Sequence, residues 1–296
     1  MLIKYGFGIA ITVPQATPLI TLLDVRDHRR PDVIDESDFV TTPAVPVSIY
    51  RDQFGNICRR MIAPPGEFTI TLGGTIQDSG DTDIVDPTLG EVPVADLPDD
   101  VLVYLLGSRY CETDRLSGLA WAEFGGVQPG WARVQAIVDF VHRRISFDYL
   151  QARDTRTAAE AYEERVGVCR DFAHLTIALC RALNIPARYV NGYLGDIGVP
   201  KDPAPMDFSA WCEIYLGGRW CAFDARHNKP RIGRIPVAYG RDATDVPLVH
   251  SFGQHTLTTF KVWTDEVQAN AVGLADSEEP TTPRQFVGEI AARSAA

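Results

Sequence analysis

Long apolar runs are missing from this sequence of 296 residues. No stretch reaches the roughly 18 apolar residues that would cross a bilayer, and the alternating N-terminus meets Pro14 before a signal-peptide core can form. Positive charge is also scarce, because 28 Lys and Arg stand against 39 Asp and Glu and give a net charge of -11. We therefore expect a cytoplasmic protein with no membrane contact and no nucleic-acid partner.

The sequence also has no two cysteines separated by only a few residues. Zinc sites use close cysteine pairs, and disulfide scaffolds concentrate cysteines in short chains, whereas the cysteines here are few and widely spread. The simplest interpretation is a set of reduced thiols without a zinc site. These cysteines are Cys58, Cys111, Cys169, Cys180, Cys212 and Cys221.

Basic residues are absent from residues 73–100, which are rich in Asp, Glu, Gly and Pro. This composition is typical of a solvated connection, and we place an acidic linker at residues 76–100. A calcium-binding loop is the alternative interpretation. The ligand spacing and central Gly of an EF-hand are not there, so the sequence favours a linker without metal.

Changes in periodicity on either side of the linker predict the domain organisation. Residues 1–75 show strand alternation and a hairpin-like connection at 52–56, which predict an N-terminal β-domain. Residues 101–265 carry helical patterns near 102–106, 115–124 and 132–145, then strand patterns that end with 256–263. Residues 266–296 read as a C-terminal tail with one short helix near 285–292.

The sequence around Cys169 predicts a buried helix with a thiol at its start. Gly167 breaks the preceding pattern and Pro186 stops the next one, so Cys169 falls in the first turn. Unpaired N–H groups and the helix dipole favour a thiolate there, but only by about 0.3 to 1 kcal/mol. We therefore expect a minority of Cys169 to be ionised at neutral pH.

A second hairpin is predicted around a two-residue turn at Gly217 and Gly218. In that register Tyr215 faces Trp220, and alternation sorts the side chains onto two faces. One face then carries Ser209, Trp211, Glu213 and Asp224, and the other carries Ala210, Cys212, Ile214, Cys221 and Phe223. We expect Glu213 to pair with a base such as Arg188.

Two segments resemble the transglutaminase-like superfamily of papain-type cysteine enzymes, including its bacterial branch, which has an N-terminal β-domain. The first is Gly167 to Tyr193, with Val168-Cys169-Arg170-Asp171 and Asn184-Ile185-Pro186. The second is Ala210-Trp211-Cys212-Glu213, followed by Gly218-Arg219-Trp220 and Phe223-Asp224. The resemblance implies an α+β fold whose Cys169 helix packs on an antiparallel sheet. It also implies thiol-dependent acyl chemistry on peptide or amide substrates, by hydrolysis or transfer, with no metal or organic cofactor.

The same resemblance implies roles for individual residues. Cys169 would be the nucleophile, Asp224 the orienting carboxylate, and Trp211 a wall of the substrate site. Ser209 stands at the position where the family has its triad histidine. A serine can neither lower the pKa of a thiol by its charge nor protonate a leaving amine.

Another histidine could supply the missing base. His227 lies on the wrong face if its strand continues, but the following Lys229-Pro230 indicates that the strand ends, which leaves a fold-back toward Cys169 open. His250 and His255 could reach the site from a loop, whereas His174 points elsewhere on the Cys169 helix.

Two further alternatives stay open at this point. The basic residues of 226–234 favour a solvated loop over a site for a carboxylate-bearing substrate. The rival function is a non-catalytic descendant that uses the site to bind a peptide or protein partner. The sequence predicts no oligomeric state.

Overall fold

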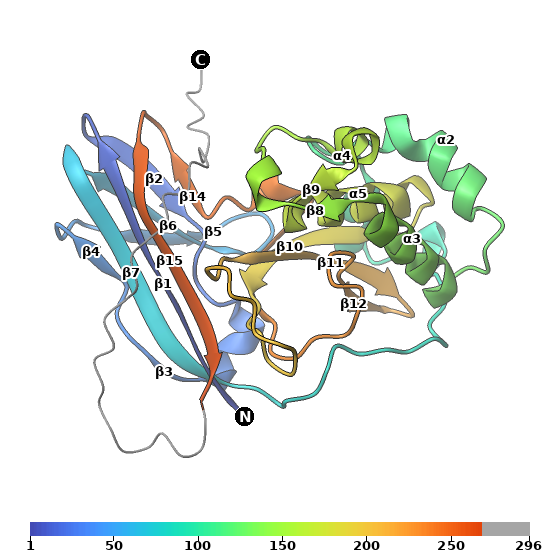
Figure 1. Cartoon of the computed structure of the whole chain (residues 1–296), viewed down its shortest axis with the longest axis horizontal. Coiled ribbons are helices and arrows are strands. Elements are labelled where there is room, and N and C mark those ends of the chain that lie inside the picture. The colour runs from blue at the N-terminus through green and yellow to red at the C-terminus, as the bar shows by residue number, and fades with distance from the viewer. Residues whose placement is uncertain (268–296) are drawn as a thin grey trace.

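Two antiparallel sheets form one side of the molecule, and a third sheet covered by helices forms the other (Figure 1). The computed structural model describes residues 1–267. The first sheet has the strand order β15-β1-β7-β3, with β4 also paired to β7, and the second has the order β14-β2-β6-β5. Their strands are β1 (Leu2–Val13), β2 (Thr17–Thr21), β3 (Val33–Glu36), β4 (Val40–Thr42), β5 (Ser48–Arg51), β6 (Ile57–Ala63), β7 (Gly66–Gln77), β14 (Val249–Ser251) and β15 (Thr256–Glu266).

The strand patterns predicted in the N-terminal part are confirmed. β5 and β6 pair as antiparallel neighbours across residues 52–56. In β7, Phe68, Ile70 and Leu72 are buried while the residues between them are partly exposed. Alternating apolar residues therefore place one face of β7 in the core, as a period of two requires.

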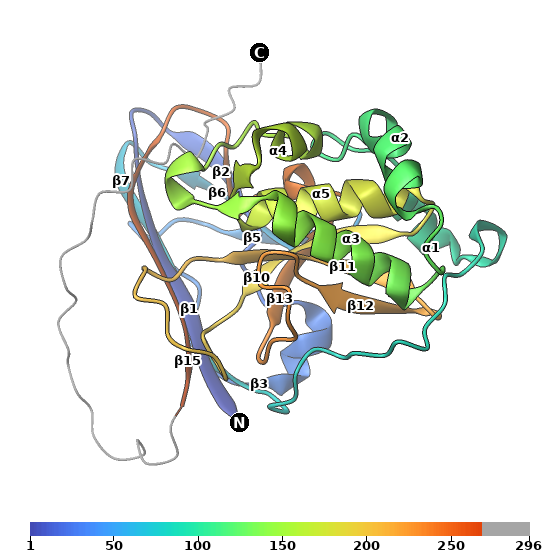
Figure 2. The ribbon, with the colours of Figure 1, turned by 45° about the vertical axis from the view of Figure 1, so that its right-hand side comes forward.

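The last described strand, β15, forms an edge of the first sheet and does not join the third sheet. β15 pairs with β1 along nearly its whole length, and Figure 2 shows the two lying side by side. The sequence groups residues 256–263 with the segment 101–265, because local periodicity carries no information about a partner some 250 residues away in sequence. The predicted helix near residues 285–292 lies outside the described residues.

Helices cover one face of the third sheet, whose order is β12-β11-β10-β13 (Figure 2). The central helix α5 packs against α2, α3, α4, β10 and β11, so it is surrounded on most sides. The α-helices are α1 (Asp99–Leu102), α2 (Thr113–Phe124), α3 (Trp131–Arg144), α4 (Ala158–Glu164) and α5 (Cys169–Ala182). The strands of this part are β8 (Ser146–Phe147), β9 (Val166–Gly167), β10 (Ala187–Tyr193), β11 (Ser209–Leu216), β12 (Arg219–Phe223) and β13 (Ile235–Gly240). The short 3-10 helices are η1 (Asp27–Asp32), η2 (Val94–Asp96), η3 (Val103–Leu105), η4 (Tyr149–Gln151) and η5 (Ala243–Asp245).

Local signals in the helical part behave as predicted. Thr157 and Glu160 form the capping box of α4, each side chain bonded to the backbone N–H of the other residue. Gly217 and Gly218 both have positive φ, and Tyr215 pairs with Trp220 in the predicted register. The mixed α+β architecture expected from the resemblance is confirmed.

Ion pairs hold the acidic segment 76–100 against the body of the molecule. Asp86 pairs with Arg219 at 2.8 Å, and Glu91 pairs with Arg133 at 3.1 Å. Because Arg133 is 8% exposed, the second pair anchors the segment to helix α3 more strongly than a surface pair would.

Two negative findings concern residues 1–267. None of their helices combines the length and apolar character that a membrane crossing requires. No three His, Cys, Asp or Glu side chains in the same range gather as a metal site would need.

Candidate functional site

Cys169 is the first residue of α5 and is partly exposed, whereas the other five cysteines are buried. No acceptor within the described part of the chain bonds the backbone N–H groups of Cys169 and Arg170. Unpaired N–H groups are expected in the first turn of any helix. Here two of them flank the candidate nucleophile, so a carbonyl oxygen attacked by the sulfur would find donors beside it.

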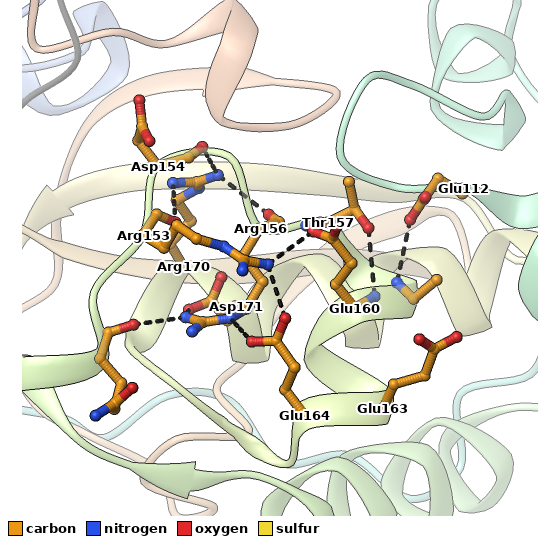
Figure 3. Close-up of polar contacts among 12 residues, drawn as sticks. Glu112, Arg153, Asp154, Arg156, Thr157, Glu160, Glu163, Glu164, Arg170 and Asp171 are labelled. Atoms are coloured by element: carbon orange, nitrogen blue, oxygen red, sulfur yellow. Dashed lines mark hydrogen bonds and ion pairs between the residues drawn. The ribbon is translucent and has the colours of Figure 1, made fainter.

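A buried carboxylate fixes the start of α5 (Figure 3). Asp171 accepts a hydrogen bond from the Val168 N–H at 2.9 Å and an ion pair from Arg156 at 3.1 Å. Arg156 also binds Glu164 at 2.9 Å. A Cβ on Gly167 would lie 2.6 Å from the Asp171 carboxylate, so only glycine permits this fold-back.

Arg170 fastens the loop that precedes α4. Its guanidinium donates to the carbonyl oxygens of Arg153, Asp154 and Arg156 (Figure 3) and lies 4.4 Å from the ring centre of Tyr110. The residue that follows the candidate nucleophile is therefore anchored by several contacts. The backbone that carries the thiol is held in place from both sides.

The pKa of the Cys169 thiol is raised to about 11. Burial among surrounding protein atoms is the main cause, and the carboxylates of Asp207 and Asp224 raise it further, while the Arg226 guanidinium and a backbone hydrogen bond from Ala210 lower it. Burial therefore outweighs the helix dipole that led us to expect a minority of thiolate. At pH 7.5 only about one thiol in 3,000 would be ionised at that pKa.

Position 209 starts the strand that touches the thiol. Ala210, the next residue, supplies the backbone hydrogen bond to the Cys169 sulfur. Alternation places the Ser209 side chain on the same face as Trp211, and the buried Ser209 hydroxyl has no partner in the described part of the protein. Whether Ser209 acts at the family's histidine position stays a prediction.

Trp211 packs on the face of the sheet that points away from α5. It is 1% exposed, lies against Val190 and Tyr239, and carries the Arg234 guanidinium 4.9 Å from its ring centre. Neighbouring Glu213 pairs with Arg188 at 2.6 Å, which confirms the pairing expected from the sequence. A wall role for Trp211 stays a prediction, and its burial gives a ligand no direct access to the ring.

Asp224 and His227 form a hydrogen-bonded pair. β12 ends at Phe223, and the chain turns so that Nδ1 of His227 lies 2.9 Å from a carboxylate oxygen of Asp224. Burial alone would raise the pKa of Asp224, but the His227 hydrogen bond and the Arg234 charge outweigh it and hold the pKa well below its usual range. The backbone N–H groups of Arg226 and His227 also bond this carboxylate, so Asp224 caps the turn as well.

The other candidate histidines lie elsewhere. His174 is fully buried, accepts a hydrogen bond from the Ala243 N–H, and has its pKa lowered well below the usual value, mainly by burial. His250 belongs to β14, which pairs with β2, and His255 directly precedes β15. These two histidines therefore belong to the sheets formed largely by the N-terminal part of the chain.

The expectation of a solvated basic loop is wrong for two of its members. Arg231 and Arg234 are buried, because acidic partners neutralise them. Arg234 binds Asp83 at 2.9 Å and Asp224 at 3.2 Å, and Arg231 lies 3.5 Å from Asp196. The run of basic residues at 226–234 does not by itself indicate these acidic partners, because they come from other segments of the chain.

Sequence reasoning missed Arg226 and Tyr149 as neighbours of the thiol. Both act on Cys169 electrostatically, and the guanidinium of Arg226 lies 5.9 Å from the ring centre of Tyr149. The available signal was weak: Arg226 follows Asp224 by two residues in a turn. A cation in that turn lies close to the groups that the Asp224 side chain faces.

Comparisons with known proteins agree with this geometry. A family model described as the transglutaminase-like superfamily matches residues 119–225. The solved structure of a "Putative Cysteine Protease" from Cytophaga hutchinsonii is similar, with a TM-score of 0.76, 31% identity and coverage of 94% of both chains. An uncharacterized protein of Mycobacterium leprae is 27% identical over 222 residues, which cover 70% of this chain and 76% of that protein. An uncharacterized protein of Mycobacterium tuberculosis H37Rv is 33% identical over 117 residues, which cover 35% of this chain and 37% of that protein. Since the similarity to the Cytophaga hutchinsonii protein spans nearly the whole of both chains, this chain belongs to the transglutaminase-like superfamily.

Proposed function

We propose that this protein carries out cysteine-dependent acyl chemistry on a peptide or protein substrate, with Cys169 as the nucleophile. The observation that carries the proposal is the position of Cys169, a partly exposed residue at the N-terminus of a buried helix, next to two unpaired backbone N–H groups. The similar Cytophaga hutchinsonii protein, described as a "Putative Cysteine Protease", supports the same reaction class.

The chemical steps follow from the residue types. The Cys169 thiolate attacks a carbonyl carbon, the bond to the leaving group breaks, and an acyl-thioester forms on the sulfur. Water or an amine then attacks this thioester and restores the thiol. His227, oriented by Asp224, takes the proton from the incoming group and delivers one to the leaving group.

Leaving groups decide how fast such a site works. An amine leaves poorly without a proton, and general acid catalysis contributes about 10² to 10⁴ in rate. A thiol leaving group departs as a thiolate and needs no proton. Ser209, at the family's histidine position, cannot supply this proton, so an amide depends on His227 for it, whereas a thioester does not.

Binding without turnover is the second candidate function. The raised pKa of Cys169 and the hydroxyl at position 209 both favour it, because they slow the attack step. In that case the site would bind a peptide and leave it intact.

Two peptides with the same acyl group, one a thioester and one an anilide, separate these possibilities. We expect the wild-type protein to release the thiol, Cys169→Ala to abolish release, and His227→Asn to slow the anilide more than the thioester. Equal release by wild type and Cys169→Ala would contradict the proposal. Saturable binding of both peptides without release would establish the second candidate instead.

A further inference from the structure

Arg226 carries a charge that no carboxylate in the described part of the chain neutralises by an ion pair. Its guanidinium carbon lies 3.8 Å from the ring centre of Phe147, a geometry that holds the cation over the aromatic face. Its backbone N–H donates to Asp224 at 3.1 Å. Arg226 is therefore fixed at both ends, yet its charge remains available.

The ring under Arg226 lies beside the start of α5. Phe147 pairs with Gly167 in the parallel β8 and β9 ladder, and the next N–H, from Asp148, donates to the Gly167 carbonyl at 3.0 Å. Gly167 precedes Cys169 by two residues. The contacts from Arg226 through Phe147 to Gly167 thus place a fixed cation beside the segment that leads into Cys169.

Several other groups also act on the sulfur. Asp207 and Asp224 oppose the thiolate, as do the hydroxyls of partly buried Tyr149 and buried Tyr189 when ionised. Desolvation raises the pKa of Asp207 to about 6, whereas the Arg226 guanidinium lowers it. Of the charged groups that influence this thiol most, Arg226 is the one that favours its ionisation, and no imidazole is among them.

We propose that Arg226 is the cation that stabilises the Cys169 thiolate, while proton transfer stays with His227. This inference rests on the proposed function, since it concerns the same nucleophile. A guanidinium stays protonated at any working pH and cannot move protons. Arg226 would supply only the electrostatic part of what a triad histidine does, so the attack step depends on Arg226 and the protonation of the leaving group does not.

The expected size of the effect follows from two opposing terms. Removing an opposite charge nearby raises a pKa by about one unit or more, which lowers the thiolate fraction about tenfold. A more basic thiolate is about threefold more nucleophilic, given a Brønsted coefficient of roughly 0.4 to 0.5. The net loss of reactivity at a fixed pH below the pKa is therefore about threefold.

Alkylation by iodoacetamide at pH 8.5 measures this directly, with mass spectrometry of the Cys169 peptide as the readout. We expect Arg226→Gln to slow alkylation about threefold and Arg226→Lys to restore most of the rate. Lys261→Gln, which removes an exposed charge on β15, should leave the rate unchanged. Circular dichroism of each variant confirms that it is folded. Arg226→Lys keeps the positive charge and changes the shape of the group, so it tests whether the charge itself sets the rate.

Two results would overturn the inference: an unchanged rate in Arg226→Gln, or a loss in Lys261→Gln as large as in Arg226→Gln. Alkylation needs no substrate, so either result leaves the proposed acyl chemistry standing. Conversely, an Arg226-dependent rate combined with no acyl turnover would count against the proposed function alone.

Discussion

Replacing Arg156 with methionine tests how the start of α5 is held. Arg156 is 3% exposed and Asp171 1% exposed, so the substitution leaves a buried carboxylate without its ion-pair partner (Figure 3). Losing one partner of a buried pair costs about 3 to 5 kcal/mol. Asp171 keeps its bond from the Val168 N–H, so we expect the lower end, about 3 kcal/mol.

Urea unfolding followed by far-UV circular dichroism measures this loss. The matched control is Arg153→Met, because Arg153 binds Glu160 and Glu164 in the same network while 42% exposed. Exposed pairs contribute about 0 to 1 kcal/mol, so the control should change little. Combining Arg156→Met with Asp171→Asn should recover much of the loss, because the amide keeps an acceptor without a buried charge.

The pH dependence of this loss has a definite sign. Burial already raises the pKa of Asp171, and removing Arg156 raises it further. A carboxyl whose folded pKa is raised destabilises the fold as pH rises from the unfolded value, near 3.9, through the folded value. The deficit of Arg156→Met should therefore shrink toward pH 4. A loss no larger than that of Arg153→Met, with no recovery in the double variant, would refute the reasoning.

Three further predictions concern the sheet, the thiol and the turn. Gly6→Ala should lower the free energy of unfolding by about 1 to 3 kcal/mol, because the indole packed over Gly6 lies 2.2 Å from where a Cβ would stand. Gly118→Ala, in open space on α2, should instead raise it by up to about 1 kcal/mol, and thermal unfolding of both tests the contrast. Alkylation of Cys169 should accelerate about tenfold per pH unit between pH 6 and 9, since its pKa is about 11; a plateau below pH 9 would show that the thiol is more acidic. The stability advantage of wild type over Asp224→Asn should hold above about pH 4 and decline below it, because the folded pKa of Asp224 is depressed. An advantage that persists unchanged at pH 2.5 in urea titrations would contradict the role of the Arg234 and His227 contacts.

Features set by neighbouring residues could be predicted from the sequence. Gly217 and Gly218 accept the positive φ that a two-residue hairpin turn needs, and this fixed the register that carries Glu213 opposite Ala222. The capping box at Thr157 likewise depends on residues three apart. Such signals are complete within a short window, so no tertiary information is required.

Features that depend on residues far away in the sequence could not be predicted. The burial of Arg234 requires Asp83, which lies 151 residues earlier in an acidic segment with no local sign of pairing. The pKa of Cys169 depends on packing from several segments, whereas the helix-end argument used only the local backbone. The contact between His227 and Asp224 arises from a turn that the sequence indicated only through Lys229-Pro230.

Trapping an acyl group on the protein tests the central claim most directly. The protein is mixed with a peptide thioester, quenched in acid within seconds, digested, and analysed by mass spectrometry. The account predicts the acyl mass on the peptide that contains Cys169, with no such adduct in Cys169→Ala. Acyl adducts that are absent from wild type, or equally present in Cys169→Ala, would contradict it.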